Sequence, residues 1–327
     1  MQDKNKIIYD VLSVGDAKID IFLTLHEANE FCRIENGDFC VKQGQKIEVE
    51  HSKVLLGGNA ANVAVGLSRL GLKSALVAEI GEDEFSLKIN NTLATEQVAR
   101  GYIKHEKGKE SSLSVVINFQ GDRVIFGEHV RRPHDFSYEN ASPEWIYLTS
   151  LGEEWKQAYE KAVRFVHTNH VKLAFNPGTL QIESQSETIA NILINTKILF
   201  VNKEEGLQLL KEYSHSNGHA GHSIQTLLKS LKLLGPEIVV VSDGKNGSYC
   251  IDYDSKFYEQ RIFPHKIVER TGAGDAYSTG FLAGVFNGVP IQEAMIWGTL
   301  NAGSVIGTIG AEGGLLKLQE MEEKLRK

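Results

Sequence analysis

Thr271-Gly272-Ala273-Gly274-Asp275 stands directly before an apolar run from Ala276 to Phe286, and this junction is the most informative stretch of the chain. Small residues followed by a carboxylate at a helix start predict an anion site, because the first helical turn leaves its N–H groups unpaired and carries positive dipole character. Glycine allows the backbone to approach a ligand closely. An aspartate would repel a bound phosphate, so we expect it to take a proton from a hydroxyl brought to that phosphate. The pattern favours phosphoryl transfer.

Short β-branched runs alternate with amphipathic stretches along most of the chain. This alternation predicts an α/β fold with a doubly wound, mostly parallel sheet and helices on both faces. The predicted strands are Ile7–Val14, Ala75–Ile80, Val171–Phe175, Ile198–Val201 and Ile238–Val241. The predicted helices cover about 60–70, 84–98, 153–168, 203–213 and 221–234.

Two regions, about 17–56 and 101–130, break the alternation and read as strands without helices. Within the second, Ser114–Phe119 and Arg123–Phe126 flank a turn and predict a hairpin. Strands without crossover helices do not join a doubly covered parallel sheet easily. We therefore expect a single α/β domain over residues 1–327, with a discontinuous antiparallel β lid inserted at these two places.

Composition excludes several classes of protein. The net charge is −7 and Lys and Arg form no long cluster, which argues against a nucleic-acid partner. No segment reaches the apolar length that spans a bilayer, and the N-terminus lacks the apolar core of a signal peptide. We expect a cytoplasmic protein that does not act at a membrane.

Cysteine and histidine give no sign of a metal site. Cys32, Cys40 and Cys250 are odd in number and lack CxxC spacing, so we expect reduced thiols, with a Cys32–Cys40 pair across a hairpin as the alternative. His215, His219 and His222 lie among glycines and predict a solvated loop rather than a zinc site.

Polar groups at two predicted helix and strand ends suit a polyol ligand. Gly57-Gly58-Asn59-Ala60-Ala61-Asn62 opens the clearest predicted helix and offers close backbone approach and carboxamides. The alternative is a tight turn capped by Asn59. Asp16 and Asp20 follow the first strand, where α/β sheets collect ligands, although acids in a solvated turn would look the same.

Two further strand ends suit a nucleotide. Asn202 and Glu205 share one face of a starting helix, where a carboxylate can hold Mg²⁺ through water or simply complement the helix dipole. Asp243, Gly244 and Gly247 form either a nucleotide loop or a β-turn. Gly244-Lys245 lacks the glycine spacing and the following Ser/Thr of a P-loop, and Tyr277 breaks GxGxxG, which argues against Walker ATPases and hydride-transferring dehydrogenases.

Taken together, these motifs resemble the ribokinase-like, or PfkB-type, carbohydrate kinase family, along essentially the whole chain. The stretch from Gly57 to Gly71 is similar to the family's N-terminal signature. Thr271 to Asp275, with Tyr277 to Gly284, is similar to its C-terminal signature. The resemblance implies a mostly parallel sheet with helices on both faces and an antiparallel lid.

The resemblance also implies roles for individual residues. Asp275 matches the base, and Gly272, Ala273 and Gly274 match the amides of the anion hole. Asn202 and Glu205 match the element that tunes Mg²⁺ and the phosphates. The acceptor-binding positions are Asp16, Asp20, Gly57, Gly58, Asn59, Asn62 and Asn176. The ATP-site positions are Asn202, Glu205, Asp243, Gly244, Gly247, Thr271 and Asn301.

The sequence departs from the family pattern at two places. Glu269-Arg270 replaces an Asp-Thr pair that many relatives carry in a segment tied to a monovalent cation, which argues against potassium activation. Asn59 stands where relatives that act on phosphorylated sugars, and ribokinase itself, often carry lysine. This indicates a neutral acceptor.

These observations lead to the hypothesis of an ATP- and Mg²⁺-dependent kinase that phosphorylates a primary hydroxyl of a small, non-phosphorylated carbohydrate. In a loose transition state, Asp275 can act as base with an ordinary pKa of about 4. A nucleoside kinase is the alternative, with Phe22, Phe31, Phe39 and Phe119 as candidate contacts to the base. A ligand-sensing protein without turnover is a minor alternative. A homodimer formed through the lid is also expected.

Overall fold

The computed structural model describes residues 6–27, 30–120, 122–214, 223–264 and 266–326. Its core is a nine-stranded sheet in the order β15-β14-β13-β12-β11-β10-β1-β6-β7, parallel from β7 to β13 and antiparallel at β14 and β15. Its strands are β1 (Ile7–Val14), β6 (Ser74–Ile80), β7 (Ala99–His105), β10 (Ala141–Thr149), β11 (Lys172–Asn176), β12 (Ile198–Asn202), β13 (Ile238–Ser242), β14 (Ser248–Ile251) and β15 (Phe257–Gln260).

The strand order reverses beside β1. The chain proceeds from β1 to β6 and β7 on one side, and β10 then pairs with the other side of β1. A crevice forms at the carboxyl ends of strands where the winding direction changes. Asp16 follows β1, and its backbone N–H donates to Ser150, which follows β10, over 3.2 Å. The topology therefore places the first aspartate of the predicted site at this switch point.

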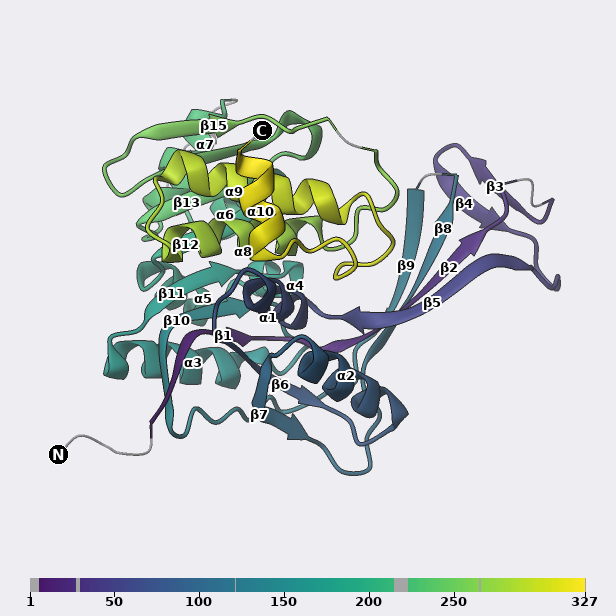
Figure 1. Ribbon diagram of the computed structural model, residues 1–327, viewed down its shortest axis with the longest axis horizontal. Helices are drawn as coiled ribbons and strands as arrows, with labels where there is room; N and C mark the ends of the chain where they lie inside the picture. Colours follow the sequence, from purple (N-terminus) through teal and green to yellow (C-terminus); the bar gives the residue numbers. More distant parts are fainter. Residues whose placement is uncertain (1–5, 28–29, 121, 215–222, 265, 327) are drawn as a thin grey trace.

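Helices cover both faces of the large sheet, as Figure 1 shows. One apolar cluster packs α3, α5, α6 and α7 against one face, and others pack α1, α2, α8, α9 and α10 against the opposite face. The helices are α1 (Asn59–Arg69), α2 (Glu84–Thr95), α3 (Trp155–Asn169), α4 (Thr179–Glu183), α5 (Glu187–Ile194), α6 (Lys203–Tyr213), α7 (Ile224–Lys232), α8 (Ala273–Phe286), α9 (Ile291–Val305) and α10 (Leu318–Leu325), with a 3-10 turn at Gly244–Asn246.

A second sheet of four strands projects from the side of this body (Figure 1). We call it the small sheet. It has the order β5-β2-β8-β9, with antiparallel outer pairs β5–β2 and β8–β9 and a parallel pair β2–β8 between them. Its strands are β2 (Lys18–Leu25), β5 (Val49–Gly57), β8 (Leu113–Phe119) and β9 (Asp122–Glu128).

The boundary predicted near residue 101 is wrong, because β7 (Ala99–His105) pairs in parallel with β6 at the edge of the large sheet. Every side chain of β7 is half-buried or exposed, because an edge strand is incompletely covered. The second segment of the small sheet starts instead at Leu113. The predicted hairpin is confirmed as β8 and β9.

A short hairpin of β3 (Cys32–Glu35) and β4 (Asp38–Val41) lies at the far end of the projecting small sheet (Figure 1). Cys32 lies opposite Val41 and Cys40 opposite Arg33, so the two thiols point to opposite faces and both are free. The alternative of a disulfide is therefore wrong. His215, His219 and His222 lie outside the described residues.

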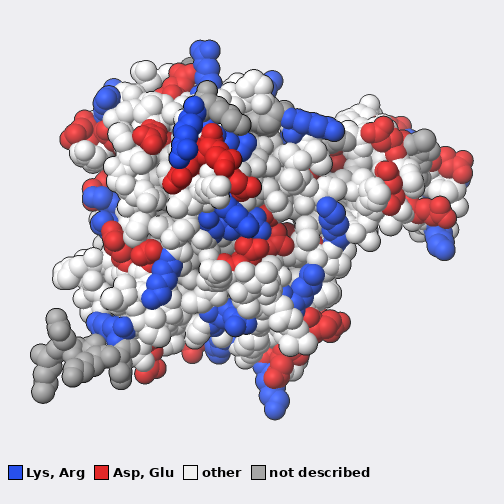
Figure 2. Space-filling view, in the orientation of Figure 1, with Lys and Arg blue, Asp and Glu red and all other residues white. Residues whose placement is uncertain are grey.

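The described helices include none with both the length and the apolar character that crossing a bilayer requires. On the face drawn in Figure 2, basic side chains are interspersed with acidic ones over the body and the projecting small sheet. This face carries no broad surface of a single sign.

Small residues let three helices approach one another behind the predicted anion site. A Cβ on Gly280 of α8 would lie 2.5 Å from the Trp297 carbonyl oxygen of α9, and one on Gly66 of α1 would lie 2.6 Å from Thr279 Cγ2 of α8. Real Cβ contacts are longer than this, so both positions need glycine for these helix approaches. The start of α8 is thereby fixed between α1 and α9.

Candidate active site

A cavity of about 280 Å³ opens at the carboxyl ends of β11, β12 and β13 and reaches the start of α8. Eight of the predicted site residues line it together: Asn59, Asn176, Asn202, Glu205, Gly272, Ala273, Gly274 and Asp275. These residues come from positions 59 to 275 of the chain, so the fold brings distant parts of the predicted site together.

The start of α8 has the geometry of an anion site. Gly272 is its N-cap with φ 78°, a left-handed conformation, and a Cβ there would lie 2.3 Å from Ala311 Cβ. Gly274, by contrast, has a helical backbone and is exposed. A Cβ added at Gly274 would have no neighbouring protein atom within 4 Å. Glycine in a helix is unfavourable by about 0.5–1 kcal/mol relative to alanine. Packing therefore explains Gly272, whereas Gly274 leaves room for a ligand.

Asp275 lies at the base of this helix turn and is 8% exposed. Its Oδ2 accepts a hydrogen bond of 2.9 Å from Asn62 Nδ2. Burial raises the pKa of Asp275 to about 7, the carboxylates of Asp20 and Glu205 raise it further, and the Asn62 hydrogen bond opposes the rise. The expectation of an ordinary pKa of about 4 is therefore wrong, since it ignored the desolvation of the carboxylate.

Asp16 and Asp20 do not line the cavity, but the Asp20 carboxylate is close enough to raise the pKa of Asp275. Burial raises the pKa of Asp16 to about 6 and also raises that of Asp20, with Lys18 opposing both shifts. A Cβ on Gly57 would lie 2.2 Å from Asp20 Oδ2, and one on Gly58 would lie 2.4 Å from the Asp16 carbonyl oxygen. The two glycines thus let α1 begin directly against the aspartates.

The two remaining carboxamides of the predicted acceptor site both line the cavity. Asn59 is the first helical residue of α1 rather than its cap, and its Nδ2 donates to Ser150 Oγ over 2.9 Å. Asn176 Nδ2 donates to the Phe200 carbonyl oxygen over 2.9 Å, and its Oδ1 accepts from the Tyr147 hydroxyl over 3.3 Å. Asn176 is held by neighbours, so its position in the cavity is fixed.

Asn202 and Glu205 form a reciprocal capping box at the start of α6. Glu205 N–H donates to Asn202 Oδ1, and Asn202 N–H donates to Glu205 Oε2, each over 2.8 Å. Burial raises the pKa of Glu205. Within the described residues, Glu205 Oε1 has no hydrogen-bond partner. A carboxylate with one uncommitted oxygen in a cavity fits Mg²⁺, which commonly takes one or two protein carboxylates and keeps waters.

Five of the predicted ATP-site residues do not line the cavity, and four of them lie in the turn after β13 or in α9. Asp243, Gly244 and Gly247 form a closed turn in which Asp243 Oδ2 pairs with Lys203 Nζ at 3.0 Å. Asn301 is fully buried, donates to the Ala276 carbonyl oxygen over 2.8 Å and accepts from Leu316 N–H over 2.9 Å. Asn301 therefore joins α9 to α8.

Thr271 also lies outside the cavity lining, and it is held by Glu269. Glu269 Oε1 accepts from Thr271 N–H over 2.7 Å and from Thr271 Oγ1 over 2.6 Å, and Arg123 Nε lies 3.4 Å from the same oxygen. A guanidinium this close to the carboxylate would repel a monovalent cation. The residues present in this segment therefore do not fit a potassium site.

The cavity is also lined by two arginines that were not predicted as site residues from the sequence. They are Arg123 of β9 and Arg270 just before α8. Arg270 has no ion pair with any described residue. The sequence could have identified Arg270 as a site residue, because it lies next to the glycine-rich stretch. It could not have identified Arg123, because the position of Arg123 depends on how the small sheet lies against a segment far along the chain.

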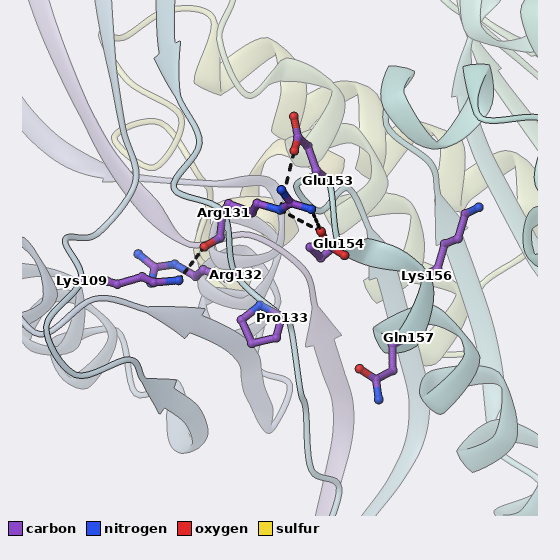
Figure 3. A pocket seen from close by; sticks show the side chains of 8 residues that line it. All are labelled: Lys109, Arg131, Arg132, Pro133, Glu153, Glu154, Lys156 and Gln157. Carbon is purple, nitrogen blue, oxygen red and sulfur yellow. Dashed lines mark hydrogen bonds and ion pairs between the residues drawn. The ribbon is translucent and has the colours of Figure 1, made fainter.

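A second cavity of about 490 Å³ lies where the chain leaves the small sheet (Figure 3). Arg131 there pairs with Glu154 and lies 3.9 Å from Glu153, while Arg132 is buried and pairs with Glu106 at 3.0 Å. Since these cations are already compensated and no residue of the Asp275 site is present, we assign the chemistry to the first cavity.

Comparison with known proteins agrees with this geometry. The sheet, its helices and the projecting small sheet form a ribokinase-like α/β fold. Residues 11–317 match the pfkB family carbohydrate kinase domain, and the chain belongs to this family. The predicted fold class, family and phosphotransferase class are confirmed.

Individual relatives are distant. The chain is 22% identical to a 5-dehydro-2-deoxygluconokinase of Geobacillus thermodenitrificans, over 82% of this chain and 83% of the relative. It is also 22% identical to a nucleoside kinase of Methanocaldococcus jannaschii, over 86% and 89% of the two chains. The Arabidopsis thaliana ribokinase structure complexed with ribose and ATP superposes with a TM-score of 0.76, at 19% identity, and covers 98% and 100% of the two chains.

Proposed function

We propose that this protein transfers the γ-phosphoryl group of ATP to a primary hydroxyl of a small, non-phosphorylated carbohydrate. The observation that carries the proposal is the pairing of an open, glycine-bearing helix start with a buried carboxylate one residue later. An anion site and a proton acceptor side by side suit attack of a hydroxyl on a phosphate.

In this mechanism, Asp275 accepts the proton of the acceptor hydroxyl as that oxygen attacks the γ-phosphorus. Asn62 orients the Asp275 carboxylate through the hydrogen bond at Oδ2. The backbone N–H groups of Gly272, Ala273 and Gly274 stabilise the charge that develops on the phosphoryl oxygens, and the free guanidinium of Arg270 adds to this. Closure of the small sheet, acting as a lid, excludes water.

Glu205 would hold Mg²⁺ through its uncommitted Oε1, directly or through water, near the phosphates. The ion neutralises charge on the phosphate oxygens when it is bound. Asn202 contributes indirectly, since its backbone N–H donates to Glu205 Oε2 and its Oδ1 caps the start of the same helix. Asp16, Asp20, Asn59 and Asn176 supply hydrogen-bond partners for the hydroxyls of the acceptor.

A carbohydrate suits this site better than a nucleoside. Three of the aromatic residues considered as contacts to a base are used in packing within or beside the small sheet. Phe22 is 1% exposed and Phe119 is 4% exposed, while Phe39 packs on Phe119 with ring centroids 5.6 Å apart. None of these three lines the cavity beside Asp275. A nucleoside acceptor would therefore need other contacts for its base.

The test measures ADP formation with ATP and Mg²⁺ against a panel of pentoses, hexoses, sugar acids and nucleosides. Acceptor-dependent ADP formation with a carbohydrate and its absence in Asp275→Asn are the expected results. Turnover with nucleosides alone would show that the acceptor class is nucleosides and not carbohydrates. The absence of acceptor-dependent turnover with every compound of the panel would contradict the kinase assignment.

A homodimer through the small sheet is part of the proposal. Val54 and Phe126 lie on the same face of this sheet and are 38% and 58% exposed, and an apolar sheet face favours association. Mass measurement in solution, with Phe126→Ser as the disrupting variant, decides between a monomer and this dimer. The cytoplasmic location expected from the sequence stays a prediction.

A further inference from the structure

An ion pair with a buried carboxylate joins the small sheet to the segment that precedes α8. The Glu269 side chain is 2% exposed, and its Oε1 accepts both hydrogen bonds from Thr271, the residue before the helix cap. Arg123 of β9 places Nε 3.4 Å from the same oxygen. A side chain of the small sheet therefore acts directly on the carboxylate that positions Thr271.

The pair is incomplete in the arrangement observed. Glu269 Oε2 and Arg123 Nε are both buried and lack hydrogen-bond partners among the residues that the structure describes. Arginine and carboxylate satisfy each other best through two parallel N–H···O bonds, and leaving such atoms unpaired in a buried site is costly. A small shift of β9 toward Glu269 would complete the pair, so this contact responds to the position of the small sheet.

We propose that Arg123 is a positioning residue for phosphoryl transfer, which acts through Glu269 on Thr271 and the first turn of α8. This inference rests on the proposed function. Closure of the small sheet over the acceptor completes the Arg123–Glu269 pair and fixes the amides of residues 272–274 around the γ-phosphate. Without an acceptor, Arg123 holds Glu269 only through the 3.4 Å contact observed here, and the incomplete pair disfavours transfer of the phosphoryl group to water.

The competing role for Arg123 is direct contact with the acceptor, since it also lines the cavity. Direct contact predicts a raised acceptor KM and a loss that adds to that of a Glu269 substitution. Action through Glu269 predicts a lower kcat and effects that do not add, because either substitution breaks the same connection.

A double-mutant cycle of Arg123→Gln and Glu269→Gln separates these roles. We expect each single variant to lower kcat by about tenfold to a hundredfold, with little change in acceptor KM. The kcat of the double variant should be no lower than that of the more impaired single variant. Arg123→Lys should restore part of kcat, because lysine keeps the charge without the guanidinium fork. Additive losses, or a change confined to KM, would overturn the proposal.

Arg131→Gln is the matched control. Arg131 follows the small-sheet hairpin and pairs with a glutamate of the body, Glu154 (Figure 3), and it does not line the cavity at Asp275. We expect wild-type kcat in this variant. An equal loss in Arg131→Gln would show that any ion pair between the small sheet and the body suffices.

Hydrogen exchange of the Thr271 amide gives a readout without turnover. In the ligand-free protein, Arg123→Gln should speed this exchange by about tenfold, and Arg131→Gln should leave it unchanged. Unchanged exchange in Arg123→Gln would overturn the proposal, even if Glu269→Gln proves too unstable to study. A wild-type protein without acceptor-dependent turnover would overturn the proposed function instead, while the exchange measurement would still decide whether Arg123 positions Thr271.

Discussion

Asn62 Nδ2 donates to Asp275 Oδ2 over 2.9 Å, across 213 positions of the chain. One helical turn later on each helix, Gly66 of α1 meets Thr279 of α8 with no room for a Cβ. The close crossing at Gly66 is therefore what brings Asn62 to Asp275. Asn62 Oδ1 is buried and has no hydrogen-bond partner within the described ranges, so it remains available to accept from a hydroxyl of a bound acceptor.

The pH dependence of turnover should show the raised pKa of Asp275. Only the ionised carboxylate accepts a proton, so kcat/KM should rise with pH through about 7 and then level off. Initial rates across the pH range, with ATP and acceptor well below saturation, measure this limb for the free enzyme. A rate already constant from mildly acidic pH upward would contradict the assignment of a buried base.

Asn62→Leu should move that limb to higher pH. The hydrogen bond from Asn62 opposes the rise in the pKa of Asp275 that burial causes. Its removal should therefore raise this pKa further. We expect a shift of roughly one pH unit and a lower kcat at neutral pH. The same pH series on this variant tests the expectation, and an unshifted limb with a lower plateau would mean that Asn62 only orients the carboxylate.

Much of this site follows from local sequence, because strand ends in a parallel sheet meet at one edge. The aspartates after β1 and the Asn202–Glu205 pair after β12 were predicted on that basis. The glycines at the start of α8 were predicted from the helix-start pattern, and Asn176 at the end of β11 only from the family resemblance. Sequence did not choose between a metal ligand and a cap for Glu205, since both need an acid at the same helical position. The capping box is now observed, and Mg²⁺ binding stays a proposal.

Features that depend on distant packing were beyond the sequence. Asn301 has the residue type of a ligand contact, yet both ends of its amide are used to join α9 with α8 and Leu316. The strand β10 was not predicted, because its first half carries Ser142, Pro143 and Glu144 and lacks a continuous apolar run. Arg123 reaches Glu269 only through the pairing of β8 with β9 and the placement of the small sheet.

Asp275→Asn should abolish turnover and stabilise the protein. In the native state the Asp275 pKa lies above its unfolded value of 3.8, so ionisation between pH 3.8 and about 7 lowers the stability of the native state. Above this window a neutral amide should raise the free energy of unfolding by on the order of 1–3 kcal/mol. Urea unfolding at roughly pH 8 and pH 4 tests this, because the gain should disappear at the lower pH.

ATP affinity is the control for Asp275→Asn. The side chain is not proposed to contact the nucleotide, so the Kd for ATP should change by less than about threefold while kcat falls by orders of magnitude. Calorimetric titration gives the Kd. A variant that retains near-wild-type turnover would remove Asp275 from the role of base.

Potassium should not activate the wild-type enzyme. The Glu269 carboxylate already faces the Arg123 guanidinium at 3.4 Å, which supplies the positive charge in this segment. Rates in potassium, sodium and choline chloride at equal ionic strength should agree. A specific increase with potassium would place a cation at Glu269 Oε2, the buried oxygen that lacks a partner in the described part of the chain.

Gly274→Ala and Gly272→Ala should separate the binding role of glycine from its conformational role. At Gly274 a methyl group meets no protein atom within 4 Å and the backbone is helical, so alanine should leave the stability unchanged or raise it by up to about 1 kcal/mol. The same methyl group would occupy the space in front of the amides, and kcat should fall at least about a hundredfold.

Gly272→Ala should lower the stability of the protein, because φ is 78° and the new Cβ would clash with Ala311. We expect a loss on the order of 1–3 kcal/mol. Thermal unfolding and ADP formation measured on both variants test the pair. If Gly274→Ala kept full activity, the space in front of α8 would not be the phosphate site, since a methyl group there cannot coexist with a phosphate oxygen held by the same amides.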